Sequence, residues 1–385
     1  VIKLVNLMLV QAIKDRASDI HIEPFEKQLR LRYRVDGVLY DSAAPPKGLQ
    51  PAISSRIKIM ANLDIAERRL PQDGRFRIKL AGREVDLRVS ILPTIHGEKI
   101  VMRVLDKGNL NMNLESLGLA PDELQKFKNA IDAPHGMILM TGPTGSGKTS
   151  TLYAVLTQLN TSDVNIVTVE DPVEYQMLGV NQVQVKTEVG LTFAGGLRSI
   201  LRQDPDIVMV GEIRDSETAD IAVKAALTGH LVLSTLHTND APGAIARMVD
   251  MGIEPFLVSS SVLMVCAQRL LRKICPHCKE AFKVPADVIT RLSLSQEEAS
   301  ANTYYRGRGC SRCKDTGFLG RMAILEVLGV TNAIRELILH NTSAKALKEL
   351  ALKEGLKTLR MSGLEKAKAG LTSLDEVLRV SGSEL

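Results

Sequence analysis

The chain has 385 residues, which is enough for two or three domains that each bury a core. Its net charge is only +5 and aromatic residues make up 3% with no Trp, which argues against a protein that binds single strands by base stacking. The longest apolar run, near 256–267, is broken by serines and too short to cross a bilayer, and no signal peptide is visible. A helical pattern is already under way at Val1, so we expect further residues before it.

The first hundred residues predict an α+β domain. Apolar residues at helical spacing predict a helix over 2–17, and from Asp19 the period changes to two, which predicts strands. The pair Asp36-Gly37 predicts a tight hairpin. Later elements are expected as a helix over 50–66 and strands over 75–80, 83–91 and 98–105. We expect this domain to span 1–106 and a polar linker to follow at 107–114.

Arginines alternate with apolar residues in these strands. A solvated strand face with weak surface ion pairs explains most of them, including Arg30, Arg32 and Arg34. Arg88 and Arg103 also lie on polar strand positions, and from the residues alone the same interpretation applies to them.

The segment Gly142-Pro-Thr-Gly-Ser-Gly-Lys-Thr149 fits G-x-x-x-x-G-K-[ST], a loop that binds nucleotide phosphates. A short apolar strand at 137–141 precedes it and an amphipathic helix at 149–159 follows it, as the motif requires. Glycines let successive backbone N–H groups converge on one anion. Lys148 is expected to reach the β- and γ-phosphates of ATP, and the Thr149 hydroxyl to bind Mg²⁺. The predicted nucleotide contacts are Gly142, Pro143, Thr144, Gly145, Ser146, Gly147, Lys148, Thr149 and Ser150.

Three more apolar strands, at 164–170, 207–210 and 231–235, alternate with helical patterns such as 216–227. This alternation predicts a doubly wound, mostly parallel sheet, in which ligands bind at the carboxyl ends of the strands. Glu170-Asp171, Glu212 and His237 follow these strand ends. One such residue alone is usually structural, but together with a phosphate loop they favour a catalytic site.

ATP hydrolysis needs Mg²⁺ to be held, water to be oriented and the γ-phosphate charge to be neutralised. Glu212 follows an apolar strand at the Walker B position and is expected to hold Mg²⁺, either directly or through a bound water. Glu170 is then the candidate to polarise the attacking water, and His237 the candidate to sense the γ-phosphate. The reverse assignment of Glu170 and Glu212 fits the sequence as well.

Four cysteines form two C-x-x-C pairs. Cys275 and Cys278 with Cys310 and Cys313 predict a structural Zn²⁺ site within a module at 266–325. Buried free cysteines or a redox pair would not explain two pairs, and His277 is a less favoured ligand. Cys266 lies in an apolar run that we interpret as a core helix. A C-terminal helical region is expected at 326–385, with helices at 333–340, 343–354 and 373–380 and lysines on a solvated face.

The chain resembles the ATPases of type II secretion and type IV pilus assembly. The likeness is carried by GPTGSGKT (142–149), TVEDPVEY (168–175), LRQDPDIVMVGEIRD (201–215) and TGHLVLSTLHTNDA (228–241), and in the N-terminal third by ASDIHIEP (17–24), RVDG (34–37), LPQDGR (70–75) and REVDLRVS (83–90). It implies a RecA-like P-loop core, placed at 115–265, after a PAS-like α+β domain. The family's far N-terminal domain is expected to be absent from this sequence, and its cysteine module is typical of assembly and secretion ATPases rather than retraction ATPases.

The resemblance also implies a function. It implies a homo-hexameric, cytoplasmic ATPase that uses ATP, Mg²⁺ and Zn²⁺ and is held at the inner membrane only through a platform protein. It further implies that arginines of the N-terminal domain contact the phosphates, with Arg88 and Arg103 as the leading candidates and Arg75 as a weaker one. Arg198, Arg202 and Arg214 lie within the core motifs and are lesser candidates for contacts with nucleotide or with a neighbouring subunit. We expect pilin polymerisation in type IV pilus assembly. The alternatives are a type II secretion motor, a DNA-translocating ring and a nucleotide-gated scaffold without turnover. No stable nucleic-acid partner is expected.

Overall fold

The computed structural model describes residues 1–385 except 81, 107–112, 293, 341–342 and 383–385. The chain divides into two compact units, Val1–Leu110 and Asn111–Leu385. Most of the predicted linker, 107–114, lies outside the described residues, which resume at residue 113. Its last residue, Leu114, begins a 3₁₀ turn that is capped by the Asn113 side chain.

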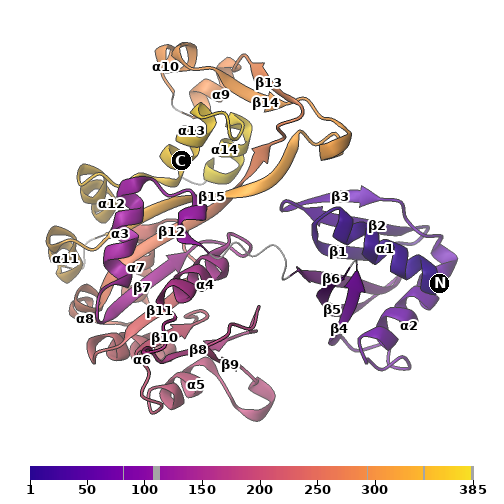
Figure 1. The fold of residues 1–385 in the computed structure, drawn as a ribbon, viewed down its shortest axis with the longest axis horizontal. Coiled ribbons are helices and arrows are strands. Elements are labelled where there is room, and N and C mark those ends of the chain that lie inside the picture. Colours follow the sequence, from indigo (N-terminus) through magenta and orange to yellow (C-terminus); the bar gives the residue numbers. More distant parts are fainter. Residues whose placement is uncertain (81, 107–112, 293, 341–342, 383–385) are drawn as a thin grey trace. The chain divides into compact units, whose positions relative to one another are not determined.

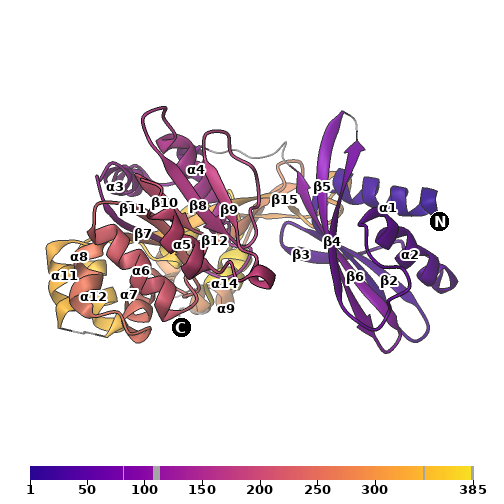
Figure 2. The same cartoon turned by 90° about the horizontal axis from the view of Figure 1, so that it is seen from below.

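The N-terminal unit is a six-stranded antiparallel sheet with two helices on one face (Figure 2). The strand order is β3-β2-β1-β6-β5-β4. The helices are α1 (Ile2–Lys14) and α2 (Gln50–Met60); the strands are β1 (Ala17–Pro24), β2 (Leu29–Val35), β3 (Val38–Ser42), β4 (Gln72–Leu80), β5 (Arg83–Thr94) and β6 (Gly97–Asp106). Apolar side chains of alternate strand residues pack under the helices, so the arginines face away from them.

In this unit the structure confirms the predicted hairpin but shortens both predicted helices. The predicted hairpin is confirmed, since Asp36 and Gly37 both have positive φ, 49° and 86°, between paired β2 and β3. Both predicted helices were too long, because α1 ends before Arg16 and α2 before Asn62. Each of these residues has a left-handed φ, 56° and 55°, which ends a helix.

The second unit is built on a seven-stranded sheet of order β15-β12-β7-β11-β10-β8-β9. Its strands are β7 (Gly136–Thr141), β8 (Ile166–Glu170), β9 (Asn181–Gln184), β10 (Ile207–Val210), β11 (Leu231–Leu236), β12 (Val262–Ile274) and β15 (Phe318–Gly329). In this order every neighbouring pair is parallel except the pair of β15 and β12, which is antiparallel. The predicted doubly wound, mostly parallel sheet is therefore confirmed.

Helices cover both faces of this sheet (Figure 1). One face is covered by α3 (Pro121–Ile131) and α4 (Lys148–Leu159), the other by α5 (Phe193–Ile200), α6 (Ser216–Leu227), α7 (Ala241–Asp250) and α8 (Pro255–Ser261). Because both faces are covered, every residue of β7 is buried, with Ile138 and Met140 toward α4 and Leu139 toward the opposite layer. Burial on both faces is why this strand is apolar throughout.

The sequence interpretation of Cys266 was half wrong. The residue is fully buried, as expected, but it lies in strand β12 and not in a helix. A strand buried on both faces is a continuous apolar run, which periodicity cannot distinguish from a buried helix. Strands β12 and β15 also run across residues 265–266 and 325–326, the expected limits of the cysteine module, so that module extends from the core sheet.

Between these strands lie α9 (Ala286–Arg291), α10 (Gln296–Ala301) and an antiparallel pair, β13 (Lys279–Phe282) and β14 (Tyr304–Gly307). The C-terminal helices are α11 (Asn332–Leu339), α12 (Ala344–Lys353), α13 (Leu359–Lys368) and α14 (Leu374–Ser381). Three of these helices match the predicted ones to within two residues.

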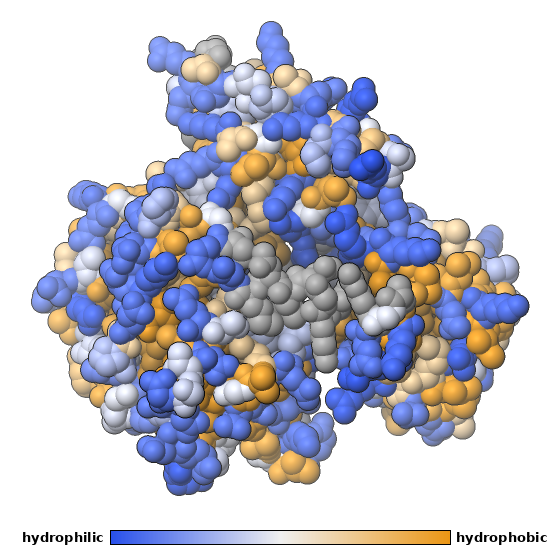
Figure 3. All heavy atoms as spheres, viewed as in Figure 1, coloured by the Kyte–Doolittle hydropathy of each residue, from blue (hydrophilic) through white to orange (hydrophobic). Residues whose placement is uncertain are grey.

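Among the residues that the structure describes, no helix is both long and apolar enough to cross a bilayer. On the face drawn in Figure 3, hydrophilic side chains cover most of the 111–385 unit and hydrophobic ones lie in small separate groups.

Candidate active site

The phosphate loop connects the end of β7 to the start of α4, as its motif predicts. Gly142 has a φ of 145°, and a Cβ there would lie 2.6 Å from the backbone oxygen of Gln268. Gly147 has a φ of 91°, and a Cβ there would lie 2.7 Å from the Gln268 side-chain nitrogen. Glycine is required at both positions by conformation and by space, and such a loop presents backbone N–H groups to an anion.

Ser146 lies within this loop and its hydroxyl is buried. Among the described residues the hydroxyl has no hydrogen-bond partner. A buried polar group without a partner costs free energy, so this oxygen fits a site that a polar ligand completes. The other predicted contacts differ in exposure: Gly142 is buried, Gly147 and Thr149 are half-buried, and Pro143, Thr144, Gly145 and Ser150 are exposed.

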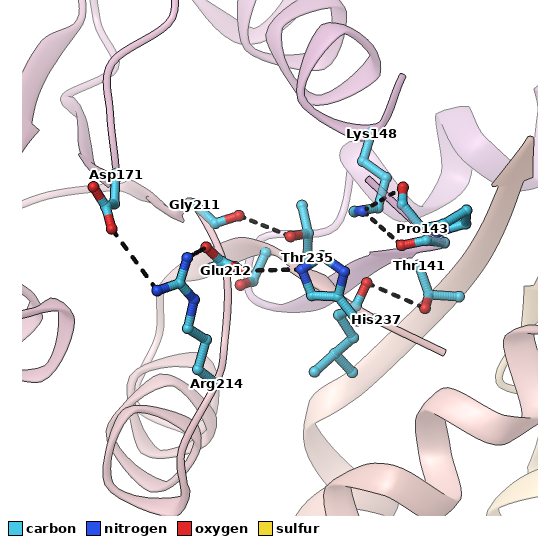
Figure 4. Close-up of polar contacts among 12 residues, drawn as sticks. Thr141, Pro143, Lys148, Asp171, Gly211, Glu212, Arg214, Thr235 and His237 are labelled. Atoms are coloured by element: carbon cyan, nitrogen blue, oxygen red, sulfur yellow. Dashed lines mark hydrogen bonds and ion pairs between the residues drawn. The ribbon is translucent and has the colours of Figure 1, made fainter. Parts of the chain in front are cut away.

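Lys148 folds back on the loop and is 8% exposed. Its ammonium donates to the backbone oxygens of Gly142, at 2.6 Å, and Pro143, at 3.2 Å (Figure 4). Burial lowers the pKa of Lys148 to about 8, Arg269 contributes in the same direction, and Glu212 acts against both. The ammonium is therefore held where an anionic phosphate would stabilise its charge.

Glu212 and His237 meet in front of the loop, from the ends of β10 and β11 (Figure 4). His237 Nε2 lies 2.9 Å from Glu212 Oε2. Arg214 donates to the other oxygen of Glu212 and lies 3.8 Å from Asp171. Burial would raise the pKa of Glu212, but hydrogen bonds from Arg214 and His237 outweigh it and lower the pKa. Glu212 therefore stays ionised near neutral pH, as a carboxylate must to hold hydrated Mg²⁺.

Glu170 faces a different set of partners. It is 2% exposed and points toward α4, where its carboxylate accepts hydrogen bonds from Tyr153, Thr168 and Gln182 at 2.5, 2.6 and 3.1 Å. The structure thus brings Glu212 and His237 together, while Glu170 is enclosed one strand further along the sheet.

The N-terminal arginines form a row across the polar face of their own sheet. Arg75 pairs with Arg88, Arg88 with Arg103, and Arg103 with Asp19, which in turn pairs with Arg34. Arg103 Nε lies 3.1 Å from Asp19 Oδ1, and Arg34 Nε lies 3.6 Å from Asp19 Oδ2. Sequence reasoning assigned Arg34 to the solvated face, but cross-strand register puts it in the same row as Arg88 and Arg103.

Two core residues that contact the site were missed. Tyr153 was expected only as part of an amphipathic helix, and Gln182 was not singled out. The available signal for Tyr153 is its position four residues after Thr149, which places both on one helix face. Two other arginines of the core motifs have local partners: Arg198 pairs with Glu217, and Arg202 donates to the backbone of Arg198.

The four cysteines of the C-x-x-C pairs lie together, with sulfur atoms all within 4.8 Å of one another. The Sγ distances from Cys275 to Cys310 and from Cys278 to Cys313 are 3.9 and 3.8 Å. Tetrahedral Zn²⁺ with bonds of about 2.3 Å requires sulfurs about 3.8 Å apart, so this donor set fits zinc. Burial would raise the pKa of Cys313, but N–H groups of Cys310 and Gly317 pointing at its sulfur lower the pKa to about 7. His277 Nε2 lies 3.1 Å from Arg312 and outside the cluster.

A glycine-rich loop between strand and helix, with acidic and histidine side chains at neighbouring strand ends, defines a RecA-like P-loop protein. The profile of the family described as "Type II/IV secretion system protein" matches residues 1–379. The chain belongs to this family.

Known proteins of the family are similar over nearly the whole chain. The type IV pilus assembly ATPase PilB of Myxococcus xanthus is 56% identical over 380 residues, which cover 98% of this chain and 67% of that protein. The type II secretion system ATPase E of Vibrio cholerae is 53% identical over 381 residues, covering 99% of this chain and 75% of that protein. The relatives are secretion and pilus ATPases.

Solved structures agree on the fold. The Legionella pneumophila ATPase DotB has a TM-score of 0.72 at 20% identity and covers 99% of this chain and 95% of its own. The pilus retraction motor PilT, solved with bound ADP, has a TM-score of 0.64 at 26% identity, with coverage of 98% and 97%.

Proposed function

We propose that this chain is a motor ATPase that hydrolyses Mg²⁺-ATP to power type IV pilus assembly. The observation that carries ATP hydrolysis is the Glu212–His237 pair, 2.9 Å apart, at the strand ends beside the phosphate loop. The names of the relatives support an ATPase in general, and the residue roles below are our assignments.

The loop and Lys148 bind the triphosphate. Backbone N–H groups of 142–148 surround the phosphates, and Lys148 leaves the Gly142 and Pro143 oxygens to reach the γ-phosphate. The hydroxyl of Thr149 and the carboxylate of Glu212 are the oxygen ligands that suit Mg²⁺, with Glu212 acting through bound water. When bound, Mg²⁺ neutralises charge on the β- and γ-phosphate oxygens.

Glu170 and His237 complete the assignment. Glu170 accepts a hydrogen bond from the attacking water and polarises it, while His237 contacts the γ-phosphate and reports its presence to Glu212. The arginines of the N-terminal unit, led by Arg88 and Arg103, neutralise the charge that develops on the transferred phosphoryl group. A guanidinium in that position is worth about 10³-fold or more in rate.

The assembly and the cargo are proposals that the relatives support. We infer a homo-hexamer at the cytoplasmic face of the inner membrane that acts on pilin through a platform protein. The 56% identity to a pilus assembly ATPase supports this cargo. The 53% identity to a type II secretion ATPase favours a second candidate, the assembly of a pseudopilus. Zn²⁺ bound by Cys275, Cys278, Cys310 and Cys313 would have a structural role, because four thiolates close its coordination shell.

Steady-state hydrolysis of Mg²⁺-ATP by the purified chain tests the activity. Lys148→Ala and Glu212→Gln should abolish turnover, and unchanged rates would reject the assigned site. Nucleotide binding distinguishes the two carboxylates: Glu212→Gln should raise the Mg²⁺ concentration that is needed to bind ATP, whereas Glu170→Gln should bind Mg²⁺-ATP normally without hydrolysing it. Co-purification with the platform protein of a pilus or of a secretion system identifies the cargo. Strong stimulation by DNA that falls steeply with salt would instead indicate a translocase.

A further inference from the structure

Glu170 is held by hydrogen bonds that leave part of its carboxylate available. An ionised carboxylate has about four acceptor positions. Thr168 and Gln182 both donate to Oε1, and Tyr153 donates to Oε2. Side chains among the described residues thus use three of these positions and leave the fourth, on Oε2, for a water.

The direction of the Tyr153 hydrogen bond is fixed by its other neighbours. The backbone N–H of Glu174 points at the hydroxyl oxygen at 3.3 Å. The Gln182 amide nitrogen lies 3.4 Å from the same oxygen, while its closer acceptors are Glu170 Oε1 at 3.1 Å and the Tyr175 backbone oxygen at 3.0 Å. The Gln182 amide is oriented in turn, because its oxygen accepts from the N–H of Met177 at 2.8 Å. Neither of these two nitrogens can accept a hydrogen bond, so the single proton of the hydroxyl is directed to Glu170.

Tyr153 also stays protonated. Burial raises its pKa well above the ordinary value, and the adjacent negative charge of Glu170 raises it further. The residue is fully buried, and its ring packs edge-on against Tyr175 with centroids 6.2 Å apart. The hydroxyl therefore acts as a fixed donor and not as an acid.

Helix α4 connects this donor to the phosphate loop. Thr149, the proposed Mg²⁺ ligand, and Tyr153 are four residues apart, so they lie one turn apart on one face of the helix. A movement of the helix start on nucleotide binding would therefore be passed to the Glu170 carboxylate through a single hydrogen bond of 2.5 Å.

We propose that Tyr153, assisted by Gln182, is a positioning residue for hydrolysis: it holds the Glu170 carboxylate with one acceptor position toward the attacking water and links that carboxylate to the phosphate loop. The inference rests on the proposed function, because it takes Glu170 as the group that polarises water. Neither Tyr153 nor Gln182 contacts the nucleotide in this proposal.

Tyr153→Phe tests the proposal, since it keeps the ring and removes only the hydroxyl. We expect kcat for Mg²⁺-ATP to fall about 10- to 100-fold, as a hydrogen bond to a charged group is lost, while KM changes by less than about twofold. Gln182→Met should give the same signature, with a smaller loss. Tyr33→Phe, which removes a buried hydroxyl bonded to the Met8 oxygen, is the matched control and should leave kcat unchanged.

A double mutant separates positioning from general damage. In the Glu170→Gln background, which is expected to bind Mg²⁺-ATP without hydrolysing it, Tyr153→Phe should leave the affinity for Mg²⁺-ATP unchanged. A wild-type kcat in Tyr153→Phe would overturn the inference, as would a loss of fluorescent ATP-analogue binding equal to the loss of kcat. If Glu170→Gln is inactive and Tyr153→Phe is normal, only this inference fails. If Glu170→Gln hydrolyses ATP normally, the proposed role of Glu170 fails first.

Discussion

Arg88 on β5 and Arg103 on β6 are directly opposite each other in the antiparallel ladder of the N-terminal sheet. Like charges in this arrangement repel and are destabilising by a few tenths of a kcal/mol or more. Asp19 lies 3.1 Å from Arg103 and offsets part of this repulsion. A row of cations held together at a cost in stability is typical of a surface that receives an anion.

Arg88→Ala should therefore separate stability from activity. If Arg88 has the role proposed for it, ATP hydrolysis should fall about 10³-fold, while nucleotide still binds through the core. The melting temperature of the variant should stay close to that of the wild type, because ion pairs on a sheet surface contribute little to stability. Arg30→Ala is the matched control, since Arg30 pairs with Asp41 at 2.7 Å outside the row, and it should keep its activity. Full activity in Arg88→Ala would return this residue to the class of surface ion pairs.

Nucleotide affinity should depend on pH through Lys148, whose pKa is lowered to about 8 in the nucleotide-free chain. Above pH 8 the free chain loses the ammonium proton that a bound phosphate needs, so binding must take up a proton. The dissociation constant of a fluorescent ADP analogue should therefore rise up to about tenfold per pH unit above pH 8 and level off below it. Lys148→Arg keeps its charge throughout and should show a flat profile from pH 7.5 to 9.5. A flat profile in the wild type would contradict the prediction.

Much of this site could be predicted from local sequence because its geometry is local. The loop needs glycines at fixed spacing, and the strands carrying Glu212 and His237 end where apolar runs end. The surroundings of Glu170 could not be predicted in this way. Its partners, Tyr153 and Gln182, are brought to it by the packing of a helix and a strand. In the sequence, neither their residue types nor their spacing distinguishes them from ordinary core or surface residues.

The same distinction holds for the fold. Strands with strict alternation and the Asp36-Gly37 hairpin were predicted closely, since both signals are set by neighbours in sequence. The strand containing Cys266 was read as a helix, because burial on both faces removes the alternation. The row that joins Arg34 to Arg103 depends on the register of separate strands, which no single segment encodes.

Zinc binding should depend on Cys275, Cys278, Cys310 and Cys313 and not on Cys266. We expect about one Zn²⁺ per chain by elemental analysis, and Cys278→Ser should lose it and lower the melting temperature, because a structural zinc site contributes folding free energy. Cys266→Ala is the matched control, since Cys266 is buried in β12 away from the cluster, and it should keep its zinc. Much less than one zinc per chain in the wild type, or equal zinc in both variants, would reject the site.

The ion pair between Glu376 on α14 and Arg272 on β12 should make stability depend on pH. The Glu376 carboxylate is 1% exposed and accepts hydrogen bonds from the backbone and guanidinium of Arg272 and from Arg379. Burial would raise its pKa, but these donors lower it from 4.5 to about 2. Because the folded-state pKa is depressed, the stabilisation is present above pH 4.5 and is lost as the pH falls from 4.5 toward 2.

Glu376→Gln should accordingly lose about 3 kcal/mol of unfolding free energy at pH 7, because the half-buried Arg272 guanidinium loses its counter-charge. The difference from the wild type should shrink by about 1 kcal/mol on going to pH 3.5, since the wild-type carboxylate loses part of its advantage there. Urea unfolding followed by circular dichroism at both pH values measures this. Glu280→Gln, which breaks the exposed pair with Arg306, is the matched control and should change stability by less than about 1 kcal/mol. An equal difference at pH 7 and pH 3.5 would show that packing, and not the charge of Glu376, holds α14 against the strand that leads into the zinc module.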